Sequence, residues 1–114
     1  MAKVVITEEL EKEIDKLFKA ESIKILELIY SLEENPKKGK ELANVGNVVI
    51  KELKYGTFRF YFLTDGFKIK FLKEEELKDL VLKFVRMSKK NDQQKTIEEI
   101  KNLLKKLGYG AFEK

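Results

Sequence analysis

The segment from Ile50 to Tyr61 places the strongest constraint on what this chain can fold into, because it has the pattern of a β-hairpin. Two runs of strand-forming residues flank Tyr55-Gly56-Thr57, and Gly56 has the backbone freedom that a tight reversal requires. Successive side chains of a strand point to opposite sides of a sheet. In the second arm, this alternation directs one set (Phe58, Phe60 and Phe62) to one face and another set (Thr57, Arg59, Tyr61 and Leu63) to the other. We therefore predict a core on the first face.

The same alternation gathers charged and hydrogen-bonding side chains on the second face of the hairpin. In the first arm Leu53 points inward together with Val49, so its neighbours point outward beside those of the second arm. The outward set is Glu52, Lys54, Arg59 and Tyr61. We expect this face of the sheet to be open to solvent, and we take these four side chains as the candidate functional site.

Composition limits the chemistry that this chain can perform. Its 114 residues fit a single domain over 1–114, and it contains no cysteine and no histidine. Disulfides, thiolate nucleophiles and imidazole bases are therefore excluded, and we expect no metal or other cofactor. Catalysis would have to use Lys, Arg, Tyr, Glu or Asp. The formal charge of +4 and the pI near 9.1 favour an anionic partner.

The charged fraction of 39% predicts a densely charged surface. Only two of the 24 basic residues are arginines, Arg59 and Arg86. Richness in lysine and glutamate fits a thermophilic source, and lysine-rich coding in an AT-rich genome explains it equally well. No apolar run approaches the length of a membrane span, and the start of the chain lacks the apolar core of a signal peptide. We expect a cytoplasmic protein.

The first third of the chain predicts a strand followed by two helices. Lys3–Ile6 is a short β-branched run, and Thr7 is suited to cap a helix that extends to about Lys19. Ser22 offers a second cap, and the apolar residues after it recur at helical spacing until Asn35-Pro36, where proline excludes further helix. We expect these helices to form a hairpin that covers the sheet.

The remaining segments predict further strands and a last helix. Lys37–Leu42 is a polar connector, either a solvated loop or a loop that contacts phosphate, and Asn44–Asn47 is turn chemistry. Thr64-Asp65-Gly66 predicts a turn, after which Phe67, Ile69 and Phe71 point inward and Lys68 and Lys70 outward. The later segments are a charged connector (Lys73–Asp79), an apolar strand (Leu80–Met87) and a helix (Thr96–Leu107).

Together these elements predict an α+β fold. An N-terminal strand and a helical hairpin pack on one face of a twisted antiparallel β-sheet, and a helix ends the chain. There is no glycine-rich phosphate loop, and the carboxylates lie mostly on predicted helix faces, where a solvated surface is the ordinary interpretation. The outer face of the hairpin therefore remains the main candidate for function.

Three segments of the chain resemble the RelE/ParE toxin superfamily. Glu52-Leu53-Lys54-Tyr55-Gly56-Thr57-Phe58-Arg59-Phe60-Tyr61 is similar to the signature hairpin of the family, in which Glu-Leu-basic-x-Gly is followed by an aromatic residue, an arginine and a tyrosine. Asn35-Pro36 with Gly39 and Leu42 is similar to its connector between helices and sheet. Phe84-Val85-Arg86-Met87-Ser88-Lys89-Lys90 resembles a segment of HigB-like toxins that leads into a C-terminal helix. The resemblance covers nearly the whole chain in order.

The resemblance implies the toxin of a type II toxin–antitoxin pair. Toxins of the RelE and HigB type cleave mRNA in the ribosomal A site and are silenced by a co-encoded antitoxin, so the implied partners are a cognate antitoxin protein and mRNA on the ribosome. The implied reaction is metal-free: the ribose 2′-OH attacks the adjacent phosphate, and the protein aligns the groups, moves the proton and stabilises the charge.

The resemblance also implies roles for individual residues. Arg59 is the expected phosphate clamp, because its planar fork can bind two oxygens. Lys54 is a candidate base, since the charge of Arg59 disfavours its protonated form. Arg86 is a second clamp or leaving-group stabiliser, and Tyr61 stacks on a base or relays a proton. Further RNA contacts are expected from Lys51, Lys68, Lys70, Lys89 and Lys90.

Other interpretations remain open at this point. Glu52 stands where ribonucleases of the RelE type carry a basic residue, so its carboxylate either pairs with Lys54 and disables the cluster or serves as the base. The chain is alternatively a ParE-like protein with another target, or a degenerate member that retains only the fold. It is also interpretable as a noncatalytic RNA- or protein-binding module. Lys54 and Arg59 are then solvated outer-face residues paired with Glu52, with little effect on stability.

Overall fold

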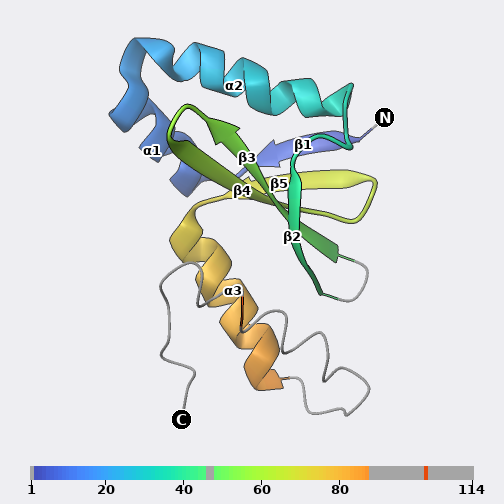
Figure 1. The fold of residues 1–114 in the computed structure, drawn as a ribbon. Coiled ribbons are helices and arrows are strands. Elements are labelled where there is room, and N and C mark those ends of the chain that lie inside the picture. Colours follow the sequence, from blue (N-terminus) through green and yellow to red (C-terminus); the bar gives the residue numbers. More distant parts are fainter. Residues whose placement is uncertain (1, 46–47, 88–101, 103–114) are drawn as a thin grey trace.

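The computed structural model describes residues 2–45, 48–87 and 102. Figure 1 shows the helices and strands as a ribbon. In chain order they are β1 (Lys3–Ile6), α1 (Glu8–Phe18), α2 (Ser22–Tyr30), β2 (Lys40–Val45), β3 (Val48–Tyr55), β4 (Phe58–Thr64), β5 (Lys68–Leu72) and α3 (Glu74–Met87). Two single-turn 3₁₀ helices, η1 (Lys19–Glu21) and η2 (Ser31–Glu33), follow α1 and α2. The fold is α+β, as predicted.

The described strands form one sheet in the order β1-β5-β4-β3-β2. Strands β2, β3, β4 and β5 pair with one another in antiparallel fashion. Strand β1 pairs with the other side of β5 and runs parallel to it, with Lys3 opposite Lys68. The N–H of Thr7 continues this pairing by donating to the carbonyl oxygen of Phe71 at 3.0 Å. The sheet is therefore mixed, and the prediction of an entirely antiparallel sheet is wrong. Local pattern identifies a strand but not a partner 65 residues away.

Helices α1 and α2 cover one face of the sheet, as Figure 1 shows and as the sequence predicted. Thr7 caps α1 by accepting from the N–H of Leu10 at 3.3 Å, which confirms the predicted cap. Ser22 does not act as a cap: it is the first residue of α2 and is buried. Both helices end before Asn35-Pro36. The buried core between these helices and the sheet consists of Ala2, Val4, Leu10, Ile14, Ile25, Ile29, Leu32, Leu53, Phe60, Phe62, Ile69 and Phe71.

Helix α3 covers the opposite face of the sheet, where we expected an open surface. Residues from α3 and from this face share a second buried core: Ala43, Ile50, Tyr61, Leu72, Leu77, Val81 and Leu82. The predicted connector Lys73–Asp79 and the predicted strand Leu80–Met87 are both wrong, because α3 spans nearly all of both segments. Leu77 and Val81 are four residues apart and both buried, which is helical spacing, and the three glutamates from Glu74 suit a helix N-terminus.

Two turns bring β2 and β5 into place. Strand β2 begins at Lys40, inside the segment predicted as a connector, and Gly39 precedes it with φ of +105° against the ring of Phe62. The predicted turn at Asp65 is confirmed, since its carboxylate accepts from the N–H groups of Phe67 and Lys68, both at 2.9 Å. Phe67 belongs to this bend and is 81% exposed, so its predicted inward position is wrong.

The structure confirms the inward positions of Ile69 and Phe71, which are fully buried. The predicted helix Thr96–Leu107 lies outside the described residues, apart from Asn102. Among the residues that the structure describes, no helix has the length and apolar character needed to cross a membrane.

Candidate functional site

The β3–β4 hairpin places the four predicted side chains on one face of the sheet. Gly56 has φ of +61° while Thr57 has an ordinary negative φ, the combination found in a type II′ two-residue turn. The resulting register sets Lys54 opposite Arg59 and Glu52 opposite Tyr61. We call Glu52, Lys54, Arg59 and Tyr61 the hairpin cluster. It lies on the face that α3 covers, because Tyr61 belongs to the α3 core.

Exposure changes along the hairpin cluster from its tip to its base. Lys54 and Arg59, next to the turn, are exposed, whereas Glu52 and Tyr61 are 5% and 8% exposed. Nη1 of Arg59 lies 3.9 Å from Oε1 of Glu52. A buried carboxylate is costly unless a charge or hydrogen bond compensates it, so this guanidinium offsets part of the cost of burying Glu52.

The surroundings of Tyr61 keep its phenol in the neutral form. Burial is the main cause that raises its pKa above 10.0; the negative charges of Glu74 and Glu52 raise it further, and the positive charge of Arg59 opposes them. Tyr61 is therefore a hydrogen-bond donor across the neutral pH range.

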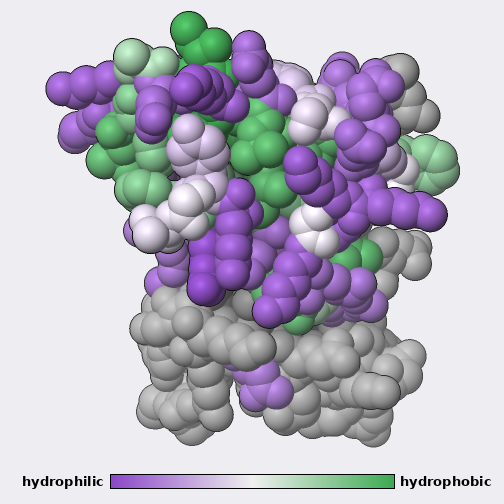
Figure 2. All heavy atoms as spheres, turned by 45° about the horizontal axis from the view of Figure 1, so that its top comes forward, coloured by the Kyte–Doolittle hydropathy of each residue, from purple (hydrophilic) through white to green (hydrophobic). Residues whose placement is uncertain are grey.

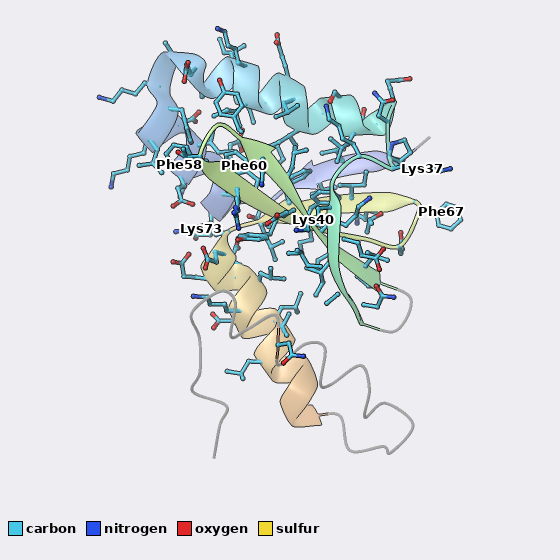
Figure 3. The ribbon with its side chains drawn as sticks, viewed as in Figure 1. Lys37, Lys40, Phe58, Phe60, Phe67 and Lys73 are labelled. Atoms are coloured by element: carbon cyan, nitrogen blue, oxygen red, sulfur yellow. The ribbon has the colours of Figure 1, made fainter. Side chains whose placement is uncertain are left out.

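A cleft of about 360 Å³ adjoins the hairpin cluster. It lies between α1, the first half of β4 and the junction of β5 with α3, and we call it the α1–α3 cleft. Figure 3 labels Phe58 and Phe60 beside α1, and Lys73 where α3 begins. Arg59, Tyr61 and Lys73 line the cleft, and so do three carboxylates, Glu13, Glu74 and Glu75. Its apolar lining comes mainly from Leu10, Ile14, Leu17, Phe18, Phe58, Phe60 and Leu72.

The lysines expected to contact RNA are not gathered at the hairpin cluster. Lys51 lies on the other face, where its Nζ donates to the carbonyl oxygen of Lys37 at 3.1 Å and sits 5.9 Å from the ring centre of Phe62. Lys68 and Lys70 are exposed and line a shallow groove with Asp65, on β5. Lys89 and Lys90 lie outside the described residues.

Arg86 belongs to α3 and not to the end of a strand. Twelve residues separate it from Glu74, which corresponds to about 18 Å along a helix axis. Glu74 lines the α1–α3 cleft together with Arg59. The backbone therefore sets Arg86 far along the helix from the end of α3 that adjoins the cluster.

The chain matches no known family, curated protein or solved structure in three separate comparisons. The site must therefore be interpreted from its own residues. Within residues 2–45, 48–87 and 102, no three Asp or Glu side chains are grouped so that they can hold a metal ion.

Two residues that the sequence analysis did not predict also belong to the site. Lys73 and Glu74 line the α1–α3 cleft, and the charge of Glu74 acts on Tyr61. The prediction of a connector over Lys73–Asp79 places neither residue at a site. The run of three glutamates before Leu77 was the available signal, since acidic residues favour the first turn of a helix.

These side chains support a limited range of chemistry. Lys54 and Arg59 offer two neighbouring cations in solvent that can hold one anionic group. Glu52 can accept a proton and Tyr61 can donate a hydrogen bond. The described site therefore offers groups that are suited to anion binding and to proton transfer.

Proposed function

We propose that this protein is the toxin of a type II toxin–antitoxin pair and cleaves ribosome-bound mRNA without a metal. The observation that carries the proposal is the pairing of Lys54 with Arg59 on one face, with Glu52 and Tyr61 next along the same face. The order of elements, in which a strand and two helices precede an antiparallel meander, is compatible with the resemblance to the RelE/ParE superfamily.

The proposed reaction is attack of a ribose 2′-OH on the adjacent phosphorus. The new bond forms a cyclic phosphate, the bond to the 5′ oxygen breaks, and a proton moves from the 2′-OH to a base and another to the leaving oxygen. Arg59 holds the phosphate oxygens, and Lys54 adds a second positive charge or takes the proton. Tyr61 acts as a donor, because its raised pKa makes its phenolate scarce.

Glu52 has a specific place in this scheme. Its carboxylate faces the Arg59 guanidinium before RNA binds. A phosphate that takes over the guanidinium would free the carboxylate to act as the base for the 2′-OH. In this scheme the pairing of Glu52 with Arg59 is a resting arrangement that the substrate replaces.

The proposal is tested with translating ribosomes by mapping mRNA 5′ ends after addition of the protein. We expect cleavage by the unaltered protein and a loss of at least about 100-fold in Arg59→Ala, because phosphate binding and charge stabilisation are both removed. Lys12→Ala, an exposed change on the outside of α1, is the control and should cleave normally.

Arg59→Ala also leaves the buried Glu52 without its cation, so a folding defect must be separated from a catalytic one. The double variant Glu52→Gln/Arg59→Ala removes the buried charge and should fold at least as stably as Arg59→Ala. It should remain inactive. Recovery of cleavage in the double variant would contradict the role of Arg59 as the phosphate clamp. Glu52→Lys, which restores the basic residue of RelE-type ribonucleases, tests whether the carboxylate activates or disables the site.

A noncatalytic binding module is the second candidate, and the contact between Glu52 and Arg59 together with the lack of histidine favours it. Binding to ribosomes or RNA without new 5′ ends would support this candidate. Inhibition of DNA gyrase would instead indicate a ParE-like target. Expression of the protein alone should arrest growth if it is a toxin, and co-expression with its proposed antitoxin should restore growth.

A further inference from the structure

Strand β4 has an unpaired edge inside the α1–α3 cleft. Strand β3 pairs with all of β4, from Phe58 to Thr64, but β5 pairs with β4 only from Tyr61 onward. The first three residues of β4 therefore have a strand on one side only. Phe58, Arg59 and Phe60 all line the cleft, so this edge faces an accessible space.

The register of the hairpin identifies the backbone groups at this edge. In a two-residue hairpin the residues that flank the turn, Tyr55 and Phe58, form a hydrogen-bonded pair, and pairs then alternate along the ladder. Lys54 and Arg59 are thus a non-hydrogen-bonded pair. The N–H and C=O of Arg59 point away from β3 toward the cleft, whereas those of Phe58 and Phe60 point toward β3.

The two outer edges of the sheet, in contrast, carry protective features. On β1, the N–H of Val4 donates to Oε2 of Glu33 at 3.1 Å, so a side chain occupies one backbone donor of that edge. On β2, the register shifts between Glu41 and Ala43, which indicates a bulge, and charged residues occupy the start of the strand. Bulges, charges and side-chain caps are the usual means of preventing strand addition. Among the described residues, the edge at Arg59 has neither a bulge nor a side-chain cap on its N–H, although charged side chains lie beside it.

The walls of the cleft differ on the two sides of the β4 edge. On the side of α1, Leu17 and Phe58 are 56% and 47% exposed, although both are large and apolar. Figure 2 shows apolar surface among hydrophilic side chains on the side of α1 and α2. On the side of α3, the exposed guanidinium of Arg59 and the half-buried Lys73 supply positive charge beside the carboxylates of Glu74 and Glu75. An added strand would therefore meet apolar side chains on one face and a wall of mixed charge on the other, with Arg59 on the unpaired edge itself.

We propose that the α1–α3 cleft binds an extended segment of a partner protein, which pairs with β4 at Arg59. The segment would alternate apolar and polar residues and carry one carboxylate: apolar side chains would contact Leu17 and Phe58, and the carboxylate, opposite Arg59, would pair with its guanidinium. Strand addition would supply hydrogen-bond partners for the free N–H and C=O of Arg59. The alternating side chains of the segment would point in turn to the apolar wall and to the charged wall of the cleft.

Peptide fits this cleft better than nucleic acid. Three carboxylates line it, from Glu13, Glu74 and Glu75, and they would repel a phosphate backbone that ran along the cleft. The phosphate of the proposed reaction would instead reach the Arg59 guanidinium from the side of Lys54, which does not line the cleft. A peptide carries its charge on single side chains and can place a carboxylate at Arg59 alone. The proposal does not require RNA cleavage. Peptide binding is measured without ribosomes, so a failure of peptide binding and a failure of mRNA cleavage can be distinguished.

Two measurements test the proposal with a synthetic, end-blocked heptapeptide in which valine alternates with serine and one glutamate replaces the central serine. In the free protein, the amide of Arg59 should exchange with solvent faster than the amides of Phe58 and Phe60, which are bonded to β3. Addition of the peptide should slow exchange at Arg59 by at least about tenfold and leave the other two little changed. Fluorescence anisotropy of the labelled peptide gives its affinity.

Changes in the peptide serve as controls that need no protein variant. Lysine in place of glutamate keeps the capacity for strand pairing but should weaken binding by about tenfold, since a like charge then faces Arg59. Methylation of the backbone nitrogen that bonds to Arg59 keeps every side chain and should weaken binding by a similar factor.

Protein variants test the charge preference. In Glu52→Gln/Arg59→Glu the preference should reverse in favour of the lysine peptide. Lys70→Glu, on the same sheet face outside the cleft, should keep the original preference.

Several results would overturn the proposal. These are no binding at millimolar peptide, equal binding of the methylated or lysine peptide, or protection that appears on β2 in place of Arg59. A single-stranded oligonucleotide that protects the Arg59 amide as well as the peptide does would show a nucleic-acid site. Protection that appears when the protein alone is concentrated would show that a second copy occupies the edge.

Discussion

The pKa of Tyr61, on β4, depends on its contact with α3. Its folded-state pKa is raised above 10.0, mainly by burial and then by the charges of Glu74 and Glu52. A raised folded-state pKa means that the neutral form stabilises the fold. This contribution is fully present below the ordinary pKa and is lost as pH rises through the folded-state value.

An alkaline titration of tyrosine absorbance should therefore contain a late part, above pH 10.0, that comes from Tyr61. We expect this late part to disappear in Tyr61→Phe. Tyr55→Phe, which removes a phenol on the opposite face, should keep this late part. The stability of Tyr61→Phe should also fall less than that of the unaltered protein between about pH 9 and pH 11. A Tyr61 transition at or below 10.0 would contradict the burial of its hydroxyl under α3.

Asp65 provides a second prediction, at acidic pH. The N–H groups of Phe67 and Lys68 hold its pKa below the ordinary 3.8, so the ionised carboxylate stabilises the turn. This contribution is present above the ordinary pKa and is lost as pH falls through the folded-state value. Asp65→Asn should be less stable than the unaltered protein at about pH 6, and the difference should shrink toward about pH 2. Urea unfolding at both pH values measures it; a difference that is independent of pH would exclude this role.

The cluster residues show what sequence could and could not establish at this scale. Alternation in the hairpin put Glu52, Lys54, Arg59 and Tyr61 on one face, because strand period is a local property. The structure then pairs Lys54 with Arg59 and Glu52 with Tyr61. Burial is not local. Glu52 and Tyr61 lie under α3, and no pattern within the hairpin distinguishes a covered face from an open one.

At the scale of elements, a comparison of two glycines distinguishes the effect of backbone strain on stability from the effect of packing. Gly39 and Gly66 have similar positive φ values, +105° and +97°. A Cβ at Gly39 would lie 2.8 Å from Cζ of the fully buried Phe62 and 3.2 Å from the carbonyl oxygen of Glu52, whereas a Cβ at Gly66 meets nothing within 4 Å. Gly66 therefore serves as a matched control for Gly39.

Gly66→Ala should cost about 1 kcal/mol or somewhat more of unfolding free energy, from backbone strain alone. Gly39→Ala should cost about a further 1–3 kcal/mol, because the ring of Phe62 is enclosed and has little room to move. Urea unfolding of the two variants gives the difference. Equal losses would mean that β2 is not held against Phe62 as described.

Helix α3 lies where the sequence predicted a connector and a strand. Leu80-Val81-Leu82 is an unbroken apolar run, which is consistent with a buried strand or with a piece of a helix. Extending the window back to Glu74 gives 14 residues with Leu77 and Val81 four apart, which favours a helix. Length, rather than hydrophobicity, was the signal that separated the two.

At the scale of the whole molecule, two contacts between distant segments set the arrangement. Strand β1 joins the sheet beside β5, and α3 covers the face opposite α1 and α2. Neither follows from local periodicity, since each depends on which of several apolar surfaces meet. The hairpin and the first two helices could be predicted, whereas the mixed sheet and the second core could not.

One hydrogen-bonded junction joins the two helical layers. The hydroxyl of Thr7, which caps α1, donates to Oε1 of Glu76 at 2.8 Å, and the same oxygen accepts from the N–H of Lys73 at 2.8 Å. Glu76 thereby caps the first turn of α3 in the manner of a capping box while it holds the start of α1. This junction adjoins Lys73 and Glu74, which line the α1–α3 cleft.

A double-mutant cycle on Thr7 and Glu76 tests whether this junction fixes α3 against the rest of the molecule. Thr7→Val should cost about 1 kcal/mol as a lost cap. Its combination with Glu76→Gln should show a coupling of at least about 0.5 kcal/mol, whereas its combination with Glu75→Gln should be additive. Because α3 buries Tyr61 and brings Glu74 near it, Glu76→Gln should also lower the pKa of Tyr61 toward 10.0. Additive losses together with an unchanged Tyr61 titration would mean that the second core alone, through residues such as Leu77 and Val81, holds α3 on the sheet.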